Sequence, residues 1–289
     1  MDNGSYDGSM SGSEITVRAI YDSIGLGYSE ISELFEYVKL LLEDSVAHPC
    51  AKGFYLQKSY DCGMEFWAHC DHTKTIRGYT PFYRGKSEYV LGLKEEFIRP
   101  GDTDFEGSIL GWAEPDPDGD HGLCPVVFDV LGRKLHSPLQ FPFESAVKMC
   151  AFAVSVDIFD SPEAYERTQT HEIKFDCEAF FPGDLLLDKP RDPHEPPSSC
   201  AVINGRILEF RKITNPVTSQ DFYWILAKTA GGIMDMVTKC GTYTSDPRVG
   251  GVITGGFWLC GQIMDPQIRK RSGLQRILRK TTSLFSTDG

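Results

Sequence analysis

The chain has 289 residues, 41% of them hydrophobic and 24% charged, with a formal net charge of −12. This length accommodates two or three compact units, and the composition is that of a globular protein, which excludes wholesale disorder. From Arg269 onward, six basic residues against Asp288 give a net charge of +5, so the preceding residues carry −17. Such an acidic body repels phosphate backbones and argues against broad nucleic-acid binding by the globular part.

The first predicted element is a helix that follows a leader. Residues 1–14 are rich in Gly, Ser and Asp and predict a flexible leader. The next segment, "SEISELFEYVKLLLEDS", predicts an amphipathic helix with Ser29 as its N-cap. Pro49 should end this helix before His48. Its apolar residues follow the spacing of a single helical face: Ile31, Leu34, Phe35, Val38, Leu41 and Leu42.

From Phe54 to Leu93 the pattern changes to period two, which is typical of strands with one buried face. In "MEFWAHC", the side chains of Met64, Phe66, Ala68 and Cys70 alternate with those of Glu65, Trp67 and His69. Together with the helix, this pattern predicts an N-terminal α+β region over residues 15–100, made of a helix and a few antiparallel strands.

The rest of the chain contains an internal similarity. The stretches "DFEGSILGW" and "VINGRILEF" share an apolar or aromatic residue, Gly, Ile-Leu and an aromatic residue at the same spacing, 98 residues apart. The same offset places residues 124–129 on 222–227, and an offset of 105 places 147–158 on 252–263. Three matched apolar strands in the same order favour a duplicated unit.

These observations predict a mostly β protein. Five short strands per unit, without an obligatory helix, indicate a small Greek-key barrel of the OB type. The two tandem barrels are expected at residues 101–181 and 200–268. Glycines in residues 250–263 would let the last strand bend enough to close the second barrel. A Pro-rich linker over residues 182–199 separates the units, and residues 269–289 form a basic tail.

The cysteines and the hydropathy pattern bear on the compartment. Nine cysteines are scattered in odd number, several of them in apolar runs, which indicates mostly reduced thiols. No stretch approaches the roughly 18 apolar residues that a membrane span requires. We therefore expect a cytoplasmic protein without a transmembrane segment.

Most familiar catalytic motifs are absent. The sequence has no Gly-rich phosphate loop, no Gly-x-Ser-x-Gly elbow and no His-Glu-x-x-His zinc motif, so no cofactor or metal is expected. The best metal candidate is the set Cys62, His69, Cys70 and His72. It is weak because His69 and Cys70 would point to opposite faces of a strand.

Two segments have the composition of a contact surface. The first combines aromatic and basic residues and suits base stacking or protein contacts: Arg77, Tyr79, Phe82, Tyr83, Arg84 and Lys86. The second is the tail, where Arg276, Arg279 and Lys280 lie beside apolar residues and would attract an acidic protein, nucleic acid or an anionic surface.

The sequence is most consistent with a non-catalytic binding protein whose partner is another protein. One alternative is an enzyme whose site is assembled from distant residues such as His69, Asp71, His121 and Asp129. The other is a nucleic-acid adaptor that acts through the basic tail. No feature of the sequence indicates an oligomeric state.

Overall fold

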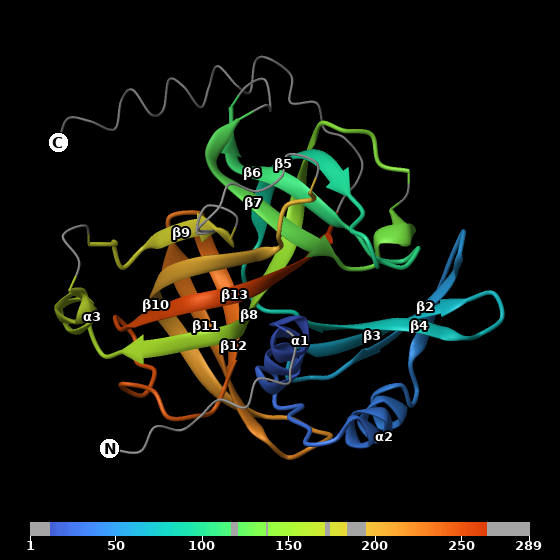
Figure 1. Cartoon of the computed structure of the whole chain (residues 1–289), viewed down its shortest axis with the longest axis horizontal. Coiled ribbons are helices and arrows are strands. Elements are labelled where there is room, and N and C mark those ends of the chain that lie inside the picture. Colours follow the sequence, from blue (N-terminus) through green and yellow to red (C-terminus); the bar gives the residue numbers. More distant parts are fainter. Residues whose placement is uncertain (1–11, 117–120, 137, 171–173, 184–194, 265–289) are drawn as a thin grey trace.

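The computed structural model describes residues 12–116, 121–136, 138–170, 174–183 and 195–264 (Figure 1). It confirms that the protein is mostly β, with thirteen strands and few helices in the described part of the chain. None of the helices described is both long enough and apolar enough to cross a membrane.

The N-terminal part combines two helices with a four-stranded antiparallel sheet in the order β1-β2-β3-β4. The predicted helix and antiparallel strands are present here, but β5 lies in the other sheet, and α1 begins inside the predicted leader and was missed. The elements are α1 (Gly12–Asp22), α2 (Ile31–Leu41), β1 (Val46–Cys50), β2 (Gly53–Ser59), β3 (Met64–Asp71) and β4 (Ile76–Tyr83).

Helix α2 starts and packs differently from the expectation. Its N-cap is Glu30, and the predicted cap Ser29 instead donates its backbone N–H to the Glu33 carboxylate at 2.7 Å. Val38 and Leu41 are buried as predicted, whereas Phe35 is 54% exposed. The apolar stripe of α2 is therefore only partly covered by the rest of the molecule.

Strand β3 is buried on both faces, which corrects the expected alternation between buried and exposed residues. On one face, Phe66 packs against Tyr21 of α1 with ring centroids 6.5 Å apart. On the other face, His69 stacks on Phe105 at 5.8 Å. The strand is enclosed because α1 covers one face and the loop before β6 covers the other.

The remaining strands close two five-stranded rings. In the first ring β5, β6 and β7 are antiparallel neighbours, β7 runs parallel to β13, β13 is antiparallel to β8, and β8 returns to β5. The strands are β5 (Tyr89–Phe97), β6 (Ser108–Pro115), β7 (Gly122–Val130), β8 (Phe143–Phe159) and β13 (Val252–Ile263).

The second ring has the same order. Strands β10, β11 and β12 are antiparallel neighbours, β12 runs parallel to β8, and β13 returns to β10. The short strand β9 (Ala179–Pro182) adds to the outer edge of β10. The other elements are β10 (Cys200–Thr214), β11 (Asp221–Thr229), β12 (Gly232–Lys239), η1 (Arg133–Leu135) and α3 (Pro162–Thr168).

The rings are repeats in strand order, but they are not separate tandem barrels. Strands β8 and β13 belong to both rings. The first ring is therefore complete only with β13, and the second only with β8. The predicted match of β8 with β13 agrees with this order. The match of 105–112 with 203–210 does not, because β6 is the second strand of its ring and β10 is the first. Both segments are apolar and carry a glycine, which made them similar in sequence.

The shared strands cross closely along their length. Twelve residues of β8 pair with twelve of β13, with a bulge at Gly256/Phe257. A Cβ on Gly255 would lie 2.1 Å from the Ser155 carbonyl oxygen, and the φ of Gly255 is +143°. The expectation that glycines shape this strand is thus met at Gly255, where only a residue without Cβ fits.

Two apolar clusters hold the fold together. The first fills both rings as one continuous core, with Leu91, Val126, Ile225 and Phe257 among its members. The second joins α1, α2 and the four-stranded sheet to the outer side of the rings. Figure 1 shows α1 between that sheet and β8, and α1 is in contact with β8.

A buried carboxylate ties the N-terminal sheet to the second ring. Asp235 on β12 is 1% exposed and accepts hydrogen bonds from Lys86 N, from Ser87 N and Oγ, and from Trp224 Nε1, at 2.5–3.0 Å. These donors belong to the connection between β4 and β5 and to β11. Asp235 thus fixes the position of that connection.

The first prediction concerns the crossing of β8 and β13. We expect Gly255→Ala to lower the free energy of unfolding by about 2 kcal/mol or more, because the new methyl group meets a backbone oxygen. Gly256→Ala is the control, since its Cβ would be 4.0 Å from the nearest atom. Chemical unfolding measures both, and equal losses would contradict the close approach.

The second prediction concerns Asp235. Asp235→Ala leaves four hydrogen-bond donors without their acceptor and should cost about 2–4 kcal/mol in unfolding free energy. Asp235→Asn keeps one acceptor oxygen and should cost less. An alanine variant as stable as the wild type in a denaturant titration would show that Asp235 does not hold the connection.

Candidate functional site

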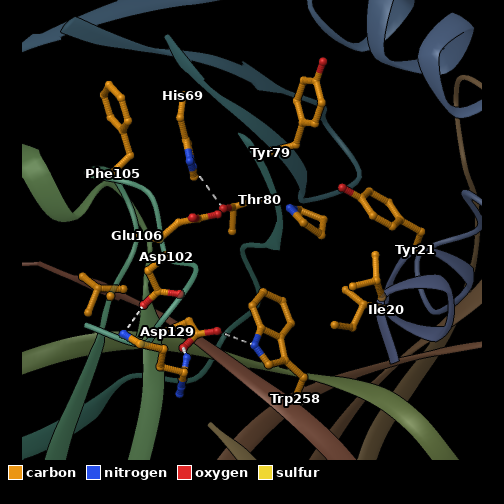
Figure 2. Close-up of a pocket in the computed structure, with 15 residues that line it drawn as sticks. Ile20, Tyr21, His69, Tyr79, Thr80, Asp102, Phe105, Glu106, Asp129 and Trp258 are labelled. Atoms are coloured by element: carbon orange, nitrogen blue, oxygen red, sulfur yellow. Dashed lines mark hydrogen bonds and ion pairs between the residues drawn. The ribbon is translucent and has the colours of Figure 1, made fainter. Parts of the chain in front are cut away.

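A cavity of about 220 Å³ lies where the N-terminal layer meets the first ring (Figure 2). Helix α1 contributes Ile20 and Tyr21, and β13 contributes Trp258. Strands β3 and β4, the loop between β5 and β6, and the end of β7 complete the walls. Figure 2 shows His69, Tyr21 and Trp258 pointing into the same space from three different elements.

His69 is the buried polar residue of this cavity. It is 2% exposed, and its Nε2 is 3.1 Å from Thr80 Oγ1, whereas its Nδ1 has no hydrogen-bond partner. Burial lowers the pKa of His69 to about 4, so the ring is neutral at pH 7. Stacking on Phe105 and an edge contact with Tyr55 hold its orientation.

Glu106 lies opposite the unpartnered nitrogen. A Cβ on Gly78 would be 3.2 Å from both His69 Nδ1 and Glu106 Oε1, so at most twice that distance separates these two atoms. Glu106 Oε2 accepts the backbone N–H of Thr103 at 2.8 Å. Both atoms therefore lie close to the backbone of Gly78, and a side chain at this position would be tightly packed against them.

Asp129 and Arg99 both line the cavity and are hydrogen-bonded to each other. Asp129 accepts hydrogen bonds from Ser108 Oγ, from Arg99 and from Trp258 Nε1, each at 2.7 Å. Arg99 also donates to the Pro197 carbonyl oxygen at 3.1 Å. Since Trp258 is on β13 and Asp129 on β7, this bond fixes the indole as one wall of the cavity.

A third carboxylate, Asp102, completes the polar part of the lining. Asp102 Oδ2 accepts the backbone N–H of Arg99 at 2.7 Å. Of the charged side chains described in the lining, Asp102, Glu106 and Asp129 are acidic and Arg99 is basic. The lining therefore combines three carboxylates and one guanidinium group with the aromatic rings of Tyr21, Phe105 and Trp258.

The predicted aromatic and basic segment does not form an open surface. Phe82 is fully buried and Tyr83 is 5% exposed against Phe222 and Trp224, so neither ring is available for stacking on a base. Tyr79 stacks on Phe66 and borders the cavity.

The basic residues of that segment are paired with acidic ones. Arg77 bonds Asp71, Arg84 bonds Glu65 at 2.7 Å, and Lys86 bonds Glu209 and lies 5.4 Å from the Trp224 ring centroid. Arg276, Arg279 and Lys280 lie outside the described residues.

The structure brings together half of the distant residues suggested for an enzyme. His69 and Asp129 both line the cavity. Asp71 instead caps the turn after β3 through Thr73 and Thr75, and His121 packs on Trp112 in the hairpin between β6 and β7.

The suggested metal ligands are dispersed. His72 is exposed and interacts with the Ala51 carbonyl oxygen, while His69 is enclosed in the cavity. Within the described ranges, no group of three or more His, Cys, Asp or Glu side chains is arranged to hold a metal ion.

Several cavity residues carried no recognisable signal in the sequence. Tyr21 belongs to the missed helix α1, and Glu106 lies inside the stretch that was interpreted only as part of a repeat. Arg99 and Asp102 belong to the turn-rich "RPGDTD" and looked like solvent-exposed turn residues. Of the residues named from the sequence, His69, Tyr79 and Asp129 do line this site.

Comparisons with protein-family models, with curated proteins and with solved structures gave no match to this chain.

The third prediction follows from the lowered pKa of His69. Between the folded value of about 4 and the usual 6.5, the unfolded state binds more protons. The contribution of neutral His69 to the unfolding free energy is therefore complete above pH 6.5 and is lost as the pH falls toward 4. Between pH 8 and pH 4.5 the loss should be on the order of 2–3 kcal/mol in unfolding free energy.

His69→Gln tests this prediction because glutamine does not titrate in this range. We expect the variant to lose less unfolding free energy than the wild type between these two pH values. Denaturant titrations at a series of pH values measure the difference. Parallel pH profiles would mean that His69 is protonated as readily in the folded state as in the unfolded chain.

Proposed function

We propose that this protein is a non-catalytic binding protein and that the cavity between α1, β4 and the first ring is its recognition site. The observation that carries the proposal is the enclosed lining of aromatic rings around His69, a buried residue of the cavity wall whose Nδ1 has no hydrogen-bond partner. Buried polar atoms nearly always have a hydrogen-bond partner, and an exception at a cavity wall is typical of a ligand contact.

The state of the polar groups supports binding over catalysis. An imidazole with a pKa of about 4 is a weak base at neutral pH, and general bases are most effective near the working pH. Asp129 accepts hydrogen bonds from three neighbouring donors and so serves to hold Arg99, Ser108 and Trp258 in place. The mixture of aromatic walls with a few convergent polar groups is that of a small-ligand pocket.

The rings supply the scaffold in this proposal. In this interpretation each ring is an OB-like Greek-key barrel, the first completed by β13 and the second by β8. The identical strand order and the parallel pairs β7–β13 and β12–β8 support it. Nine free thiols support a reducing, cytoplasmic location. A protein partner would present its contact group to the same cavity.

The fourth prediction tests the cavity as a binding site. Benzylammonium, benzyl alcohol and benzoate are probes of similar size that differ in charge. We expect at least one of them to shift the NMR signal of the Trp258 indole N–H saturably. Val17→Trp should weaken this binding about tenfold by covering the cavity mouth, because Val17 lines the mouth and is 47% exposed.

Val46→Trp is the matched control, since Val46 is exposed on β1 away from the cavity. It should bind the probes as the wild type does. The proposed function is contradicted if none of the three probes binds, or if Val17→Trp binds them unchanged.

A further inference from the structure

A groove of about 930 Å³ lies where the first ring meets the turn between β11 and β12. The connection between β4 and β5, the end of β6 and the start of β8 form its other walls. None of the residues described in this lining also lines the cavity of the proposed function. The groove is therefore a separate feature of the surface.

The charges of the groove favour a basic occupant. Four charged side chains are described in its lining: Glu88, Glu114, Glu144 and Lys86. Lys86 is bonded to Glu209, which is not part of the lining, and Glu88 lies 3.8 Å from Lys148 Nζ. The acidic groups outnumber the basic ones also when these two partners are included, so the groove attracts positive charge.

The last described residue lies near this groove. Met264 follows β13 and donates its backbone N–H to the Ala146 carbonyl oxygen of β8 at 2.9 Å, and Ala146 pairs with Val90 of β5. Residues directly opposite each other in antiparallel strands point to the same side of the sheet, so the three side chains form one row. Two strand spacings, about 10 Å, separate Met264 from Val90, which lines the groove.

This row is an apolar strip beside carboxylates. Val90 is 47% exposed and Met264 is 42% exposed, as is Ile233 of the groove lining at 47%. Glu144 precedes Ala146 by two residues on β8 and therefore lies on the same face of the strand. An occupant that combines apolar and basic side chains matches both kinds of surface.

We propose that residues 265–289 of this same chain dock in the groove. They lie outside the described part of the structure, and their sequence supplies both kinds of side chain. The basic residues are Arg269, Lys270, Arg271, Arg276, Arg279 and Lys280, and the apolar ones among them are Leu274, Ile277 and Leu278. The segment places its basic groups on the groove carboxylates and its apolar groups on the strip beside them.

Connection within one chain favours this occupant over a separate basic protein. Arg269 is five residues beyond Met264, and an extended chain spans about 3.3 Å per residue, so it reaches about 16 Å. This exceeds the distance to the groove. A tethered segment also acts at an effective concentration in the millimolar range, which suffices for exposed ion pairs that are individually weak.

Zero-length cross-linking of the full chain tests the placement. A carbodiimide joins a lysine amine to a carboxylate in contact with it, and mass spectrometry of the peptides identifies the pair. We expect Lys270 or Lys280 to be joined to Glu88, Glu114 or Glu144. If both lysines are joined only to other carboxylates, or to none, the proposal is wrong.

The same experiment on a mixture of isotope-labelled and unlabelled chains distinguishes one chain from two. Docking within a chain gives cross-links between peptides of the same label. Cross-links that combine the two labels as often as random mixing predicts would make a second copy the occupant and would overturn docking within the chain.

Trypsin cleavage within residues 265–289 measures how often the segment leaves the groove. In the double variant Glu88→Gln with Glu114→Gln, we expect cleavage about five times faster than in the wild type, because two weak ion pairs are lost. Glu36→Gln with Glu166→Gln is the matched control. It makes the same change in charge at two exposed carboxylates of α2 and α3 outside the groove lining, and cleavage should keep the wild-type rate.

Equal acceleration in the two double variants would show that net charge alone governs cleavage, and unchanged cleavage in both would show that these carboxylates do not hold the segment. Either result overturns docking in this groove. The outcome is independent of the proposed function, because the groove and the cavity have no lining residue in common among those described.

Discussion

The antiparallel pair of β8 and β13 is the constraint on which the other parts of the structure depend. A five-stranded ring closes only if its first and last strands both find partners, and here each ring borrows its closing strand from the other. Phe152 pairs with Trp258 and Ala153 with Phe257 at the middle of the crossing. The internal similarity at an offset of 105 aligns Phe152 with Phe257 and Ala153 with Trp258, so the same four residues meet at the crossing.

The exchange makes the two rings a single unit. Their interiors form one continuous apolar cluster, and neither ring retains a complete set of strands when the other unfolds. The outer faces of the same two strands are also apolar, through Cys150, Phe152 and Cys260, and the N-terminal layer packs there. The crossing therefore positions α1 and the four-stranded sheet as well as the two barrels.

The cavity is a consequence of this arrangement. Strand β4 is the edge strand of its sheet and does not join the rings, so a space remains between them. The carboxylates described above fall into two kinds, whether or not they line the cavity. Asp129 and Asp235 each accept an indole N–H and at least two other donors, and they hold elements together. Glu106 accepts a hydrogen bond from its own loop, and its other oxygen lies beside the Gly78 backbone, as does the unpartnered nitrogen of His69.

The sequence by itself determined the local features that depend on period and composition. These include the β-rich class, the helix near residues 31–41, the strands from Phe54 onward, and the similarity of the segments around 147–158 and 252–263. Each rests on interactions between residues close in the chain, or on an apolar pattern that any packing must satisfy. Helix α1 was missed because its apolar residues follow directly on a polar, Gly-rich leader.

Only the tertiary structure decided which strands share a ring and which polar residues meet. An apolar period-two segment has the same pattern whether it pairs within its own unit or with a neighbour, so strand exchange leaves no trace in one sequence. The burial of Phe82 and Tyr83, and the proximity of His69 to Glu106, likewise arise from chain segments that pack together although they are distant in sequence. Spacing along the chain carries no information about such contacts, because folding brings them together through the core and not through local geometry.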